Sequence, residues 1–312
     1  MENLIISLNV VLPLFFCMAL GYFLKGIKLC DEAGFKTINK LVFKVFLPIY
    51  LFKSIYSTDL SAAFNGKLIF FAVIAVFAWF GILMLIVPRI EKENSKRGVM
   101  IQGMFRSNFV LFGLPVATSL CGEENIGATS LLLGIVVPIF NVLAVVTLET
   151  FRGGKPSVKK MLKGIITNPL IIASVLGVLL YFLQLPLPYA VEKTVTDLGR
   201  VATPLALVAL GGEFRFSKVK GDLKQLIISV MGKLVLGPLV MVAIGIMLGF
   251  RNETLVPIVL MFGAPTAVSS YTMAQQMGGD GDLAGEIVVF TTGASIITIF
   301  FWVFALKQLA FI

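Results

Sequence analysis

The stretches GVMIQGMFRSNFVLFGLPVATSL (98–120) and TLVPIVLMFGAPTAVSSYTMAQQMG (254–278) are long and apolar, yet both carry polar residues at mid-membrane depth. Each also places a glycine two residues before a proline, Pro115 in the first stretch and Pro265 in the second. A proline removes one helical hydrogen bond and clashes with the preceding turn. In lipid, the freed backbone groups must be satisfied by protein, water or ligand. A pair of broken spans in two corresponding halves is typical of a transporter's binding site.

The two halves of the chain share a register of glycines and prolines. Three positions recur 156 residues later, which is half of the 312 residues: Pro13, Gly21 and Pro48 recur as Pro169, Gly177 and Pro204. The broken spans correspond as well, because Pro115 recurs as Pro265 at an offset of 150. This pattern predicts a duplicated half, with a first repeat at 1–150, a linker at 151–160 and a second repeat at 161–312.

The composition is that of a polytopic membrane protein. The chain is 58% hydrophobic and 14% charged, with a mean hydropathy of +0.97, far from the composition of soluble domains. It contains no histidine, and the sequence carries no Ser/His/Asp set, phosphate-binding loop, dinucleotide glycine pattern or metal-ligand cluster. We therefore expect no enzymatic activity, cofactor or metal. No nucleic-acid partner is expected either, because the basic residues cluster between apolar spans.

Ten apolar runs are long enough to cross a membrane. They lie at 4–24, 37–56, 67–88, 98–120, 126–149, 161–183, 194–212, 223–249, 254–278 and 283–306. If the N-terminus is outside, the cytoplasmic connections hold sixteen basic residues and the external segments hold five. The positive-inside rule then predicts external termini and a cytoplasmic central loop in the cell inner (plasma) membrane. Because each half has five spans, the second half is expected to be inverted relative to the first.

Polar residues around the two breaks form the candidate substrate site. Arg106 and Asn108 lie deep in an apolar run, where a charge is costly unless it faces a cavity or a partner. The half-helix after the break is expected to direct backbone N–H groups at an anion, with Asn108 as a neutral donor and acceptor. The structural alternative for Arg106 is pairing with carbonyl groups of a neighbouring helix. The candidate set is completed by Gly113, Pro115, Asn141, Pro265, Ser269, Ser270 and Gln275.

Structural roles stay open for several of these residues. Ser269 and Ser270 can bond to carbonyl groups of their own helix, and Asn141 can join two helices. Two charged residues inside spans are candidates for ion coupling. Lys233 has ten mostly apolar residues on either side and either pairs with a carboxylate or supplies a movable positive charge. Glu286 is the one acid considered for coupling to a proton or a cation, and its alternative is an interfacial carboxylate near a helix start.

Seven segments carry a more specific pattern: INKLVFKVFLPIYLFKSI (38–55), SNFVLFGLPVA (107–117), VVPIFNVLAVVTLE (136–149), NPLIIASVLGVLL (168–180), ATPLALVALGGEF (202–214), KLVLGP (233–238) and APTAVSSYTMAQQMGGD (264–280). The Asn-x4-Gly-Leu-Pro motif at 108–115 and Asn-Pro-Leu at 168–170 are the most specific. With these segments the chain resembles, over essentially its whole length, a bacterial member of the auxin efflux carrier family. That family includes relatives of the plant PIN-type auxin exporters, within the bile acid/sodium symporter-like superfamily.

The resemblance implies an all-α fold of ten transmembrane helices in two inverted five-helix repeats. Spans 1, 2, 6 and 7 would form a scaffold and spans 3–5 and 8–10 a transport domain, with spans 4 and 9 crossing at Pro115 and Pro265. Asn108 and Asn141 match polar site residues of the family. The chain departs from the pattern at Arg106, at the Gln275-Gln276 pair and in its short central loop. The arginine favours an acid that is smaller and more highly charged than auxin.

Three functions are in competition. The leading one is a secondary transporter of a small organic anion, such as a dicarboxylate or an auxin-like carboxylate, by alternating access around the crossover. A sodium-coupled organic anion symporter of the bile-acid type is the second. It needs clustered carboxylate and amide oxygens near the crossing, where Gln275 and Gln276 offer themselves. A membrane sensor without flux is the third. The lipid bilayer is the expected surrounding, H+ or Na+ the expected coupling ion, and a homodimer through the scaffold helices the expected assembly.

Overall fold

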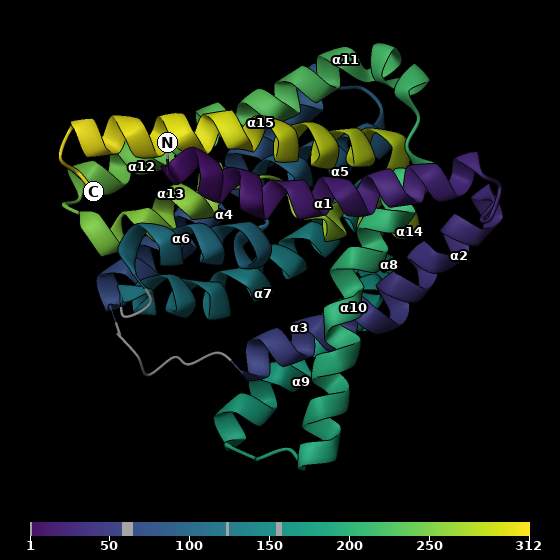
Figure 1. The fold of residues 1–312 in the computed structure, drawn as a ribbon, viewed down its shortest axis with the longest axis horizontal. Helices are drawn as coiled ribbons and strands as arrows, with labels where there is room; N and C mark the ends of the chain where they lie inside the picture. The colour runs from purple at the N-terminus through teal and green to yellow at the C-terminus, as the bar shows by residue number, and fades with distance from the viewer. Residues whose placement is uncertain (1, 58–64, 123–124, 154–157) are drawn as a thin grey trace.

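The computed structural model describes residues 2–57, 65–122, 125–153 and 158–312. Within these ranges every regular element is helical, and an isolated bridge between Ser107 and Thr266 is the single β feature. The expected all-α class is therefore confirmed (Figure 1). The elements are α1 (Glu2–Gly26), α2 (Glu32–Leu41), η1 (Val42–Phe46), α3 (Leu47–Tyr56), α4 (Gly66–Ile90), α5 (Asn94–Phe105), η2 (Phe109–Gly113), α6 (Leu114–Cys121), α7 (Gly127–Thr150), α8 (Val158–Ile166), α9 (Pro169–Leu183), α10 (Tyr189–Glu213), α11 (Phe216–Met231), η4 (Gly232–Leu236), α12 (Gly237–Met247), η5 (Asn252–Thr254), α13 (Val256–Gly263), α14 (Ser269–Met277) and α15 (Gly281–Gln308).

By length and composition, four helices of the described chain are long and apolar enough to cross a membrane: Gly66–Ile90, Gly127–Thr150, Ser217–Met247 and Gly281–Gln308. The other predicted spans coincide with helices that are shorter, interrupted or more charged. The run at 161–183 is one of these, because α8 ends at Ile166 and Asn168 begins a new helix by accepting the Leu170 N–H at 2.9 Å. The ten-span count stays a prediction. Of the predicted linker, residues 154–157 lie outside the described residues.

Three prolines are accommodated by π-helical turns and do not break their helices. Pro48, Pro115 and Pro238 each lie two residues after a five-residue π-helix, namely η1, η2 and η4. A proline clashes with the carbonyl of the residue four positions earlier, and the wider π turn is a common way to insert such an irregularity into a helix. The chain therefore continues as a helix through these prolines.

The first break is not at Pro115, as the sequence pattern suggested. Pro115 is exposed in the first turn of α6, which continues η2. The helix is interrupted earlier, between Phe105 and Phe109, where Arg106 takes an extended backbone conformation. The second break does coincide with its proline, because α13 ends at Gly263 and α14 begins at Ser269. Pro115 and Pro265 are therefore not structurally equivalent.

Glycines allow two helix pairs to approach closely. A Cβ on Gly21 of α1 would lie 2.0 Å from the carbonyl oxygen of Val208 in α10, and one on Gly177 of α9 would lie 3.0 Å from that of Phe52 in α3. Gly21 and Gly177 are separated by 156 positions, and so are Phe52 and Val208. The offset of 156 residues thus relates both the two glycines and the two backbone carbonyls that they approach.

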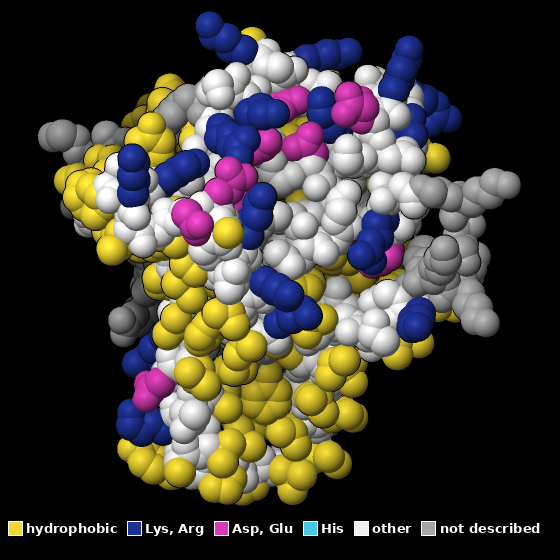
Figure 2. Space-filling model, turned by 90° about the vertical axis from the view of Figure 1, so that its right-hand side faces the viewer, with side chains coloured by type: hydrophobic (Ala, Val, Ile, Leu, Met, Phe, Trp, Pro, Cys, Tyr) yellow, Lys and Arg dark blue, Asp and Glu magenta, His cyan; other side chains and the backbone are white. Residues whose placement is uncertain are grey.

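The helices fall into two groups. In Figure 1, α3, α9 and the adjoining half of α10 extend away from the larger bundle, while α1 crosses and contacts the other half of α10. The bundle contains α4–α7 and α11–α15, and the broken helices lie within it. Figure 2 looks at the end of the molecule where α1 ends and α2 begins. Lys and Arg side chains gather there, interspersed with Asp and Glu, above a lobe with a largely hydrophobic surface.

Candidate functional site

The two helix breaks cross one another. We call residues 106–108 and 264–268 together the crossover. Asn108 N–H donates to the carbonyl oxygen of Pro265 at 2.7 Å, and Ala267 N–H donates to that of Arg106 at 3.4 Å. These bonds form the antiparallel bridge between Ser107 and Thr266. Each break therefore satisfies backbone groups that the other would leave unpaired in a low-dielectric interior.

Polar side chains satisfy the carbonyl groups at the ends of the two incoming half-helices. The Thr266 hydroxyl donates to Gly103 O of α5 at 2.7 Å. The Ser107 hydroxyl donates to Met261 O of α13. These carbonyls belong to the last turns of their helices, which have no intrahelical donors and carry partial negative charge. The side chains of each break thus complete the end of a helix that precedes a break.

Lys233 is buried at this point and completes the same network. Its ammonium group is 0% exposed, donates to Phe262 O at 3.1 Å and also donates to the Ser107 hydroxyl. Phe262 lies in the last turn of α13, so the ammonium faces the negative end of a helix dipole. Within the described residues Lys233 has no carboxylate partner, and its expected role as a movable charge stays a prediction. Lys233 binds both breaks together.

The outgoing half-helices point their N-terminal ends at a small cavity. This crossover cavity has a volume of about 50 Å³, and it is lined by Asn108 and the first residues of η2 on one side. On the other side it is lined by Ala267, Val268 and Ser269, where α14 begins. The first N–H groups of a helix have no intrahelical acceptors and carry partial positive charge. Two helix N-termini therefore face one cavity, which is the arrangement that favours an anion.

Arg106 adds a full positive charge to this cavity. Its side chain is 3% exposed and donates to Asn141 Oδ1 of α7 and, at 2.7 Å, to Met273 Sδ of α14. No ion pair within the described chain involves Arg106 or Lys233. In the described chain Arg106 has the side-chain amide oxygen of Asn141 and the sulfur of Met273 as acceptors, with no backbone carbonyl among them. Its charge is uncompensated in the described structure, which is costly for a buried guanidinium.

Free donors outnumber free acceptors around the cavity. Because a guanidinium has donors alone, Asn141 turns its oxygen toward Arg106 and leaves its amide nitrogen without a partner in the described chain. The amide nitrogen of Asn108 is also without one. Both asparagines line the cavity with Arg106. Two amide donors, a guanidinium and two helix N-termini fit a carboxylate, which accepts several hydrogen bonds.

Three cavities follow one face of α10. A larger space of about 730 Å³, here called the Lys53 vestibule, shares Tyr50, Val110, Leu111 and Thr203 with the crossover cavity. A third space of about 300 Å³, here called the Glu213 vestibule, shares no lining residue with the crossover cavity. Six of the α10 residues that line the three spaces recur every three or four positions: Thr196, Gly199, Thr203, Ala206, Leu210 and Glu213. Arg200, Pro204 and Leu207 of α10 also line the Lys53 vestibule.

Only four of the nine predicted substrate residues line the crossover cavity: Arg106, Asn108, Asn141 and Ser269. Pro265 contributes its carbonyl to the crossing, and Gly113 lies inside η2, where a Cβ would meet the ring of Phe109 at 2.4 Å. Ser270 is buried away from the cavity, and its carbonyl accepts from Gln102 at 3.0 Å. Gln275 lies two turns further along α14, in the Glu213 vestibule.

Two polar cavity residues were missed by the sequence reasoning. Tyr50 of α3 and Thr203 of α10 line the cavity from the opposite group of helices. Each flanks one of the repeated prolines, Pro48 and Pro204. The repeated prolines Pro48 and Pro204 therefore contained a usable signal for these two residues, although Asn168 beside Pro169 does not line the cavity.

Glu286 is a buried acid in a different place. It is 1% exposed, lies in the second turn of α15 and lines the Glu213 vestibule. Within the described residues neither of its carboxylate oxygens has a hydrogen-bond partner. The alternative of an interfacial carboxylate at a helix start does not fit this burial. A buried acid without a donor is costly to ionise.

Comparison with known proteins identifies the family of the chain. A family model described as membrane transport protein matches residues 6–157 and 154–303. The chain belongs to the membrane transport protein family. This confirms the resemblance to the auxin efflux carriers, and it makes the protein a multi-pass membrane transporter.

Relatives of this transporter match along almost their full length. An uncharacterized transporter of Methanothermobacter thermautotrophicus is 25% identical, over 95% of this chain and 97% of the relative. A protein of Rhizobium meliloti named "Putative malonate transporter" is 23% identical, over 93% of each chain. The uncharacterized transporter YfdV of Escherichia coli strain K12 is 24% identical, over 91% of this chain and 94% of the relative.

Proposed function

We propose that the protein is a secondary transporter of a small organic anion, which binds at the crossover and crosses the membrane by alternating access. The observation that carries this proposal is the excess of donors at one cavity: Arg106 without a counter-ion, unpartnered amides of Asn108 and Asn141, and two helix N-termini. A carboxylate supplies the missing acceptors and the missing charge. A relative carries a name that mentions malonate, so small dicarboxylates are the substrates to test first.

Alternating access fits the row of cavities along α10. The crossover cavity shares four lining residues with the Lys53 vestibule and none with the Glu213 vestibule. We propose that α1–α3 and α8–α10 form the scaffold and that α4–α7 and α11–α15 form the transport domain. Movement of the transport domain along α10 would transfer the crossover cavity from one vestibule to the other. The matched glycine contacts at Gly21 and Gly177 support the two-repeat, ten-span architecture.

The orientation belongs to the same proposal. Lys and Arg side chains gather at the end of the molecule that carries the Glu213 vestibule (Figure 2). The positive-inside rule places such an end in the cytoplasm. The Lys53 vestibule is then external, as are both termini. A cysteine introduced at residue 155 tests this orientation, because an impermeant thiol reagent should reach it only in inside-out vesicles.

Asn108→Ala tests the site. We expect the variant to bind a small dicarboxylate about 10- to 100-fold more weakly, because a buried partner of the anion is removed, at a cost of ~1–3 kcal/mol. Binding is measured by thermal shift with malonate in detergent, and flux is measured in proteoliposomes. Asn94→Ala is the control, since it removes an exposed amide at the start of α5. Unchanged affinity in the folded Asn108 variant would remove this residue from the site.

The same proteoliposomes separate the competing functions. Flux of a carboxylate excludes a sensor without transport. Equal flux with sodium and with potassium as the bulk cation excludes the sodium-coupled alternative. Absence of flux for every small carboxylate, with protein that binds none of them, would contradict the proposed function itself.

We also propose that Glu286 is the proton-coupling group. It is buried, lacks a donor and lies on α15, which moves with the proposed transport domain. The charged groups that act on it lie on α11, on α5 and at the start of α15: Asp222, Lys96, Asp280 and Asp282. Asp222 is itself paired with Lys96 at 2.9 Å. Lys233 is not proposed for coupling, because it binds the two breaks together.

Glu286→Gln should remove the pH dependence of transport. In the wild type we expect flux to fall as the external pH rises from 5.5 to 7.5, because fewer carriers load the proton that Glu286 takes up. The glutamine variant mimics the protonated acid and should transport at a rate nearly independent of pH. Flux is measured at clamped membrane potential, with correction for the substrate's own charge state. The same pH dependence in both proteins would exclude Glu286 as the coupling group.

A further inference from the structure

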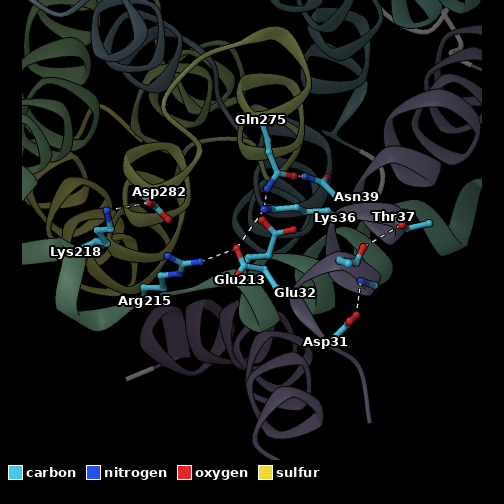
Figure 3. Close-up of polar contacts among 12 residues, drawn as sticks. Asp31, Glu32, Lys36, Thr37, Asn39, Glu213, Arg215, Lys218, Gln275 and Asp282 are labelled. Carbon is cyan, nitrogen blue, oxygen red and sulfur yellow. Dashed lines mark hydrogen bonds and ion pairs between the residues drawn. The ribbon is translucent and has the colours of Figure 1, made fainter. Parts of the chain in front are cut away.

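At the Glu213 vestibule, one side chain of the proposed transport domain forms hydrogen bonds to two side chains of the scaffold. Gln275 of α14 accepts a hydrogen bond from Asn39 Nδ2 of α2 and donates one to Glu213 Oε2 of α10. Figure 3 shows the Gln275 amide held between these two side chains. We call these three residues the Gln275 latch. They come from three helices, and α14 is the segment that leaves the crossover.

The latch lies beside the barrier between two cavities. Along α14, the crossover cavity ends at Ser269 and the Glu213 vestibule begins at Tyr271. Along α10, the corresponding residues are Ala206 and Leu210. At about 1.5 Å per residue, the separation is ~3 Å along α14 and ~6 Å along α10. Tyr271 and Leu210 are both buried and fill it.

Leu210 packs into a recess of the transport domain. A Cβ on Gly285 of α15 would lie 2.8 Å from Leu210 Cδ1 and 3.6 Å from the ring of Tyr271. The absence of a side chain at Gly285 thus makes room for Leu210 between α14 and α15. This contact is held by apolar packing alone, whereas the latch adds directional bonds next to it.

The chemistry of the latch requires an amide at position 275. Asn39 presents a donor and Glu213 presents a carboxylate acceptor, so the residue between them must both accept and donate. Glutamine does both, while a carboxylate cannot donate when ionised. The other contacts in Figure 3 do not bridge in this way. Lys36 pairs with Glu32 within α2 at 3.2 Å, and Arg215, which lies in the connection between α10 and α11, pairs with Glu32 at 2.7 Å.

We propose that Gln275 is a gating residue that holds the Leu210–Tyr271 barrier closed, and that the transport cycle requires both latch bonds to break. This inference rests on the proposed alternating access, and it assigns to Gln275 a role away from the substrate. Breaking the latch shifts the conformational equilibrium toward the state in which the crossover opens to the Glu213 vestibule.

The test measures which vestibule reaches the crossover. Ser269→Cys is introduced as a reporter after Cys17, Cys30 and Cys121 have been changed to alanine. An impermeant thiol reagent is applied to vesicles of both orientations. Gln275→Leu should accelerate labelling from the Glu213 side about tenfold, because two hydrogen bonds are lost. Labelling from the Lys53 side should slow down in the same variant.

Further variants give a graded series with a matched control. Gln275→Glu should produce the largest shift, since it replaces the donor by a second carboxylate facing Glu213. Asn39→Leu removes one of the two hydrogen bonds and should produce the smallest shift in labelling. It replaces the Gln275 variants as the test if those fold poorly. Gln276→Glu is the control, because Gln276 makes no hydrogen bond within the described chain.

The outcome distinguishes the latch from damage to the fold and from failure of the proposed function. Opposite changes on the two sides support the latch, whereas a parallel rise on both sides reports a loosened structure. Equal labelling of wild type, Gln275→Leu and Asn39→Leu would overturn the inference. The assay needs no substrate. If the variants shift the labelling but the wild type transports no carboxylate, the latch is supported and the proposed substrate class is refuted.

Discussion

Arg106→Gln should lower carboxylate transport about 100-fold while the protein keeps its fold. The guanidinium is the full positive charge that lines the crossover cavity, and hydrogen bonds to charged groups contribute ~1.5–3 kcal/mol each. Glutamine retains one amide donor for Asn141 and loses the charge. Initial rates of dicarboxylate uptake in proteoliposomes measure the effect, together with binding by thermal shift.

Two further measurements separate charge from geometry at this position. Arg106→Lys keeps the charge and loses the fork that reaches both Asn141 and Met273, so we expect an intermediate loss. Arg89→Gln removes the same charge from an exposed helix end and should transport normally. The melting temperature of Arg106→Gln should stay the same or rise, because a buried uncompensated charge is removed. Wild-type uptake in this variant would contradict an anion site at the crossover.

Gly211→Ala should destabilise the protein by about 3 kcal/mol, the upper end of the range for overpacking. A Cβ at this position of α10 would lie 1.9 Å from the carbonyl oxygen of Met18, so the backbones of α1 and α10 must separate. Backbone cannot yield as a flexible side chain does. We expect the melting temperature in detergent to fall by about 8 °C, measured by fluorescence-detected size exclusion after heating.

Other glycines provide a scale for this effect. Gly21→Ala meets the carbonyl of Val208 at 2.0 Å and should cost as much, whereas Gly177→Ala meets that of Phe52 at 3.0 Å and should cost less. Gly81→Ala in α4 meets nothing within 4 Å and should be neutral or stabilising by up to ~1 kcal/mol. Equal melting temperatures for Gly211→Ala and Gly81→Ala would show that α1 and α10 do not pack as tightly as described.

Some features of this protein are determined locally, and the sequence alone reveals them. Runs of apolar residues determine where helices form in a membrane, and the all-α class follows from them. A proline with a glycine two residues earlier determined the second break, because Pro265 cannot continue the helix that ends at Gly263. The burial of Arg106 was also predictable, since it lies in the middle of an apolar run.

Contacts between distant segments decided the rest. Pro115 has the same Gly-x-Pro pattern as Pro265, yet η2 accommodates it. The break lies at residues 106–108, where the second break supplies hydrogen-bond partners. Lys233 and Ser107 are 126 positions apart, and no pattern of neighbours along the chain predicts that pair.

Gln275 illustrates the same limit. Its polarity led to the prediction that it binds substrate. In the structure Gln275 lies in the Glu213 vestibule, away from the crossover cavity, and forms the latch. A residue's type and its neighbours in the chain determine whether it can be buried or can break a helix. Its partner is decided by which distant helix the fold brings within hydrogen-bond reach, and in this protein that depends on two breaks that satisfy one another.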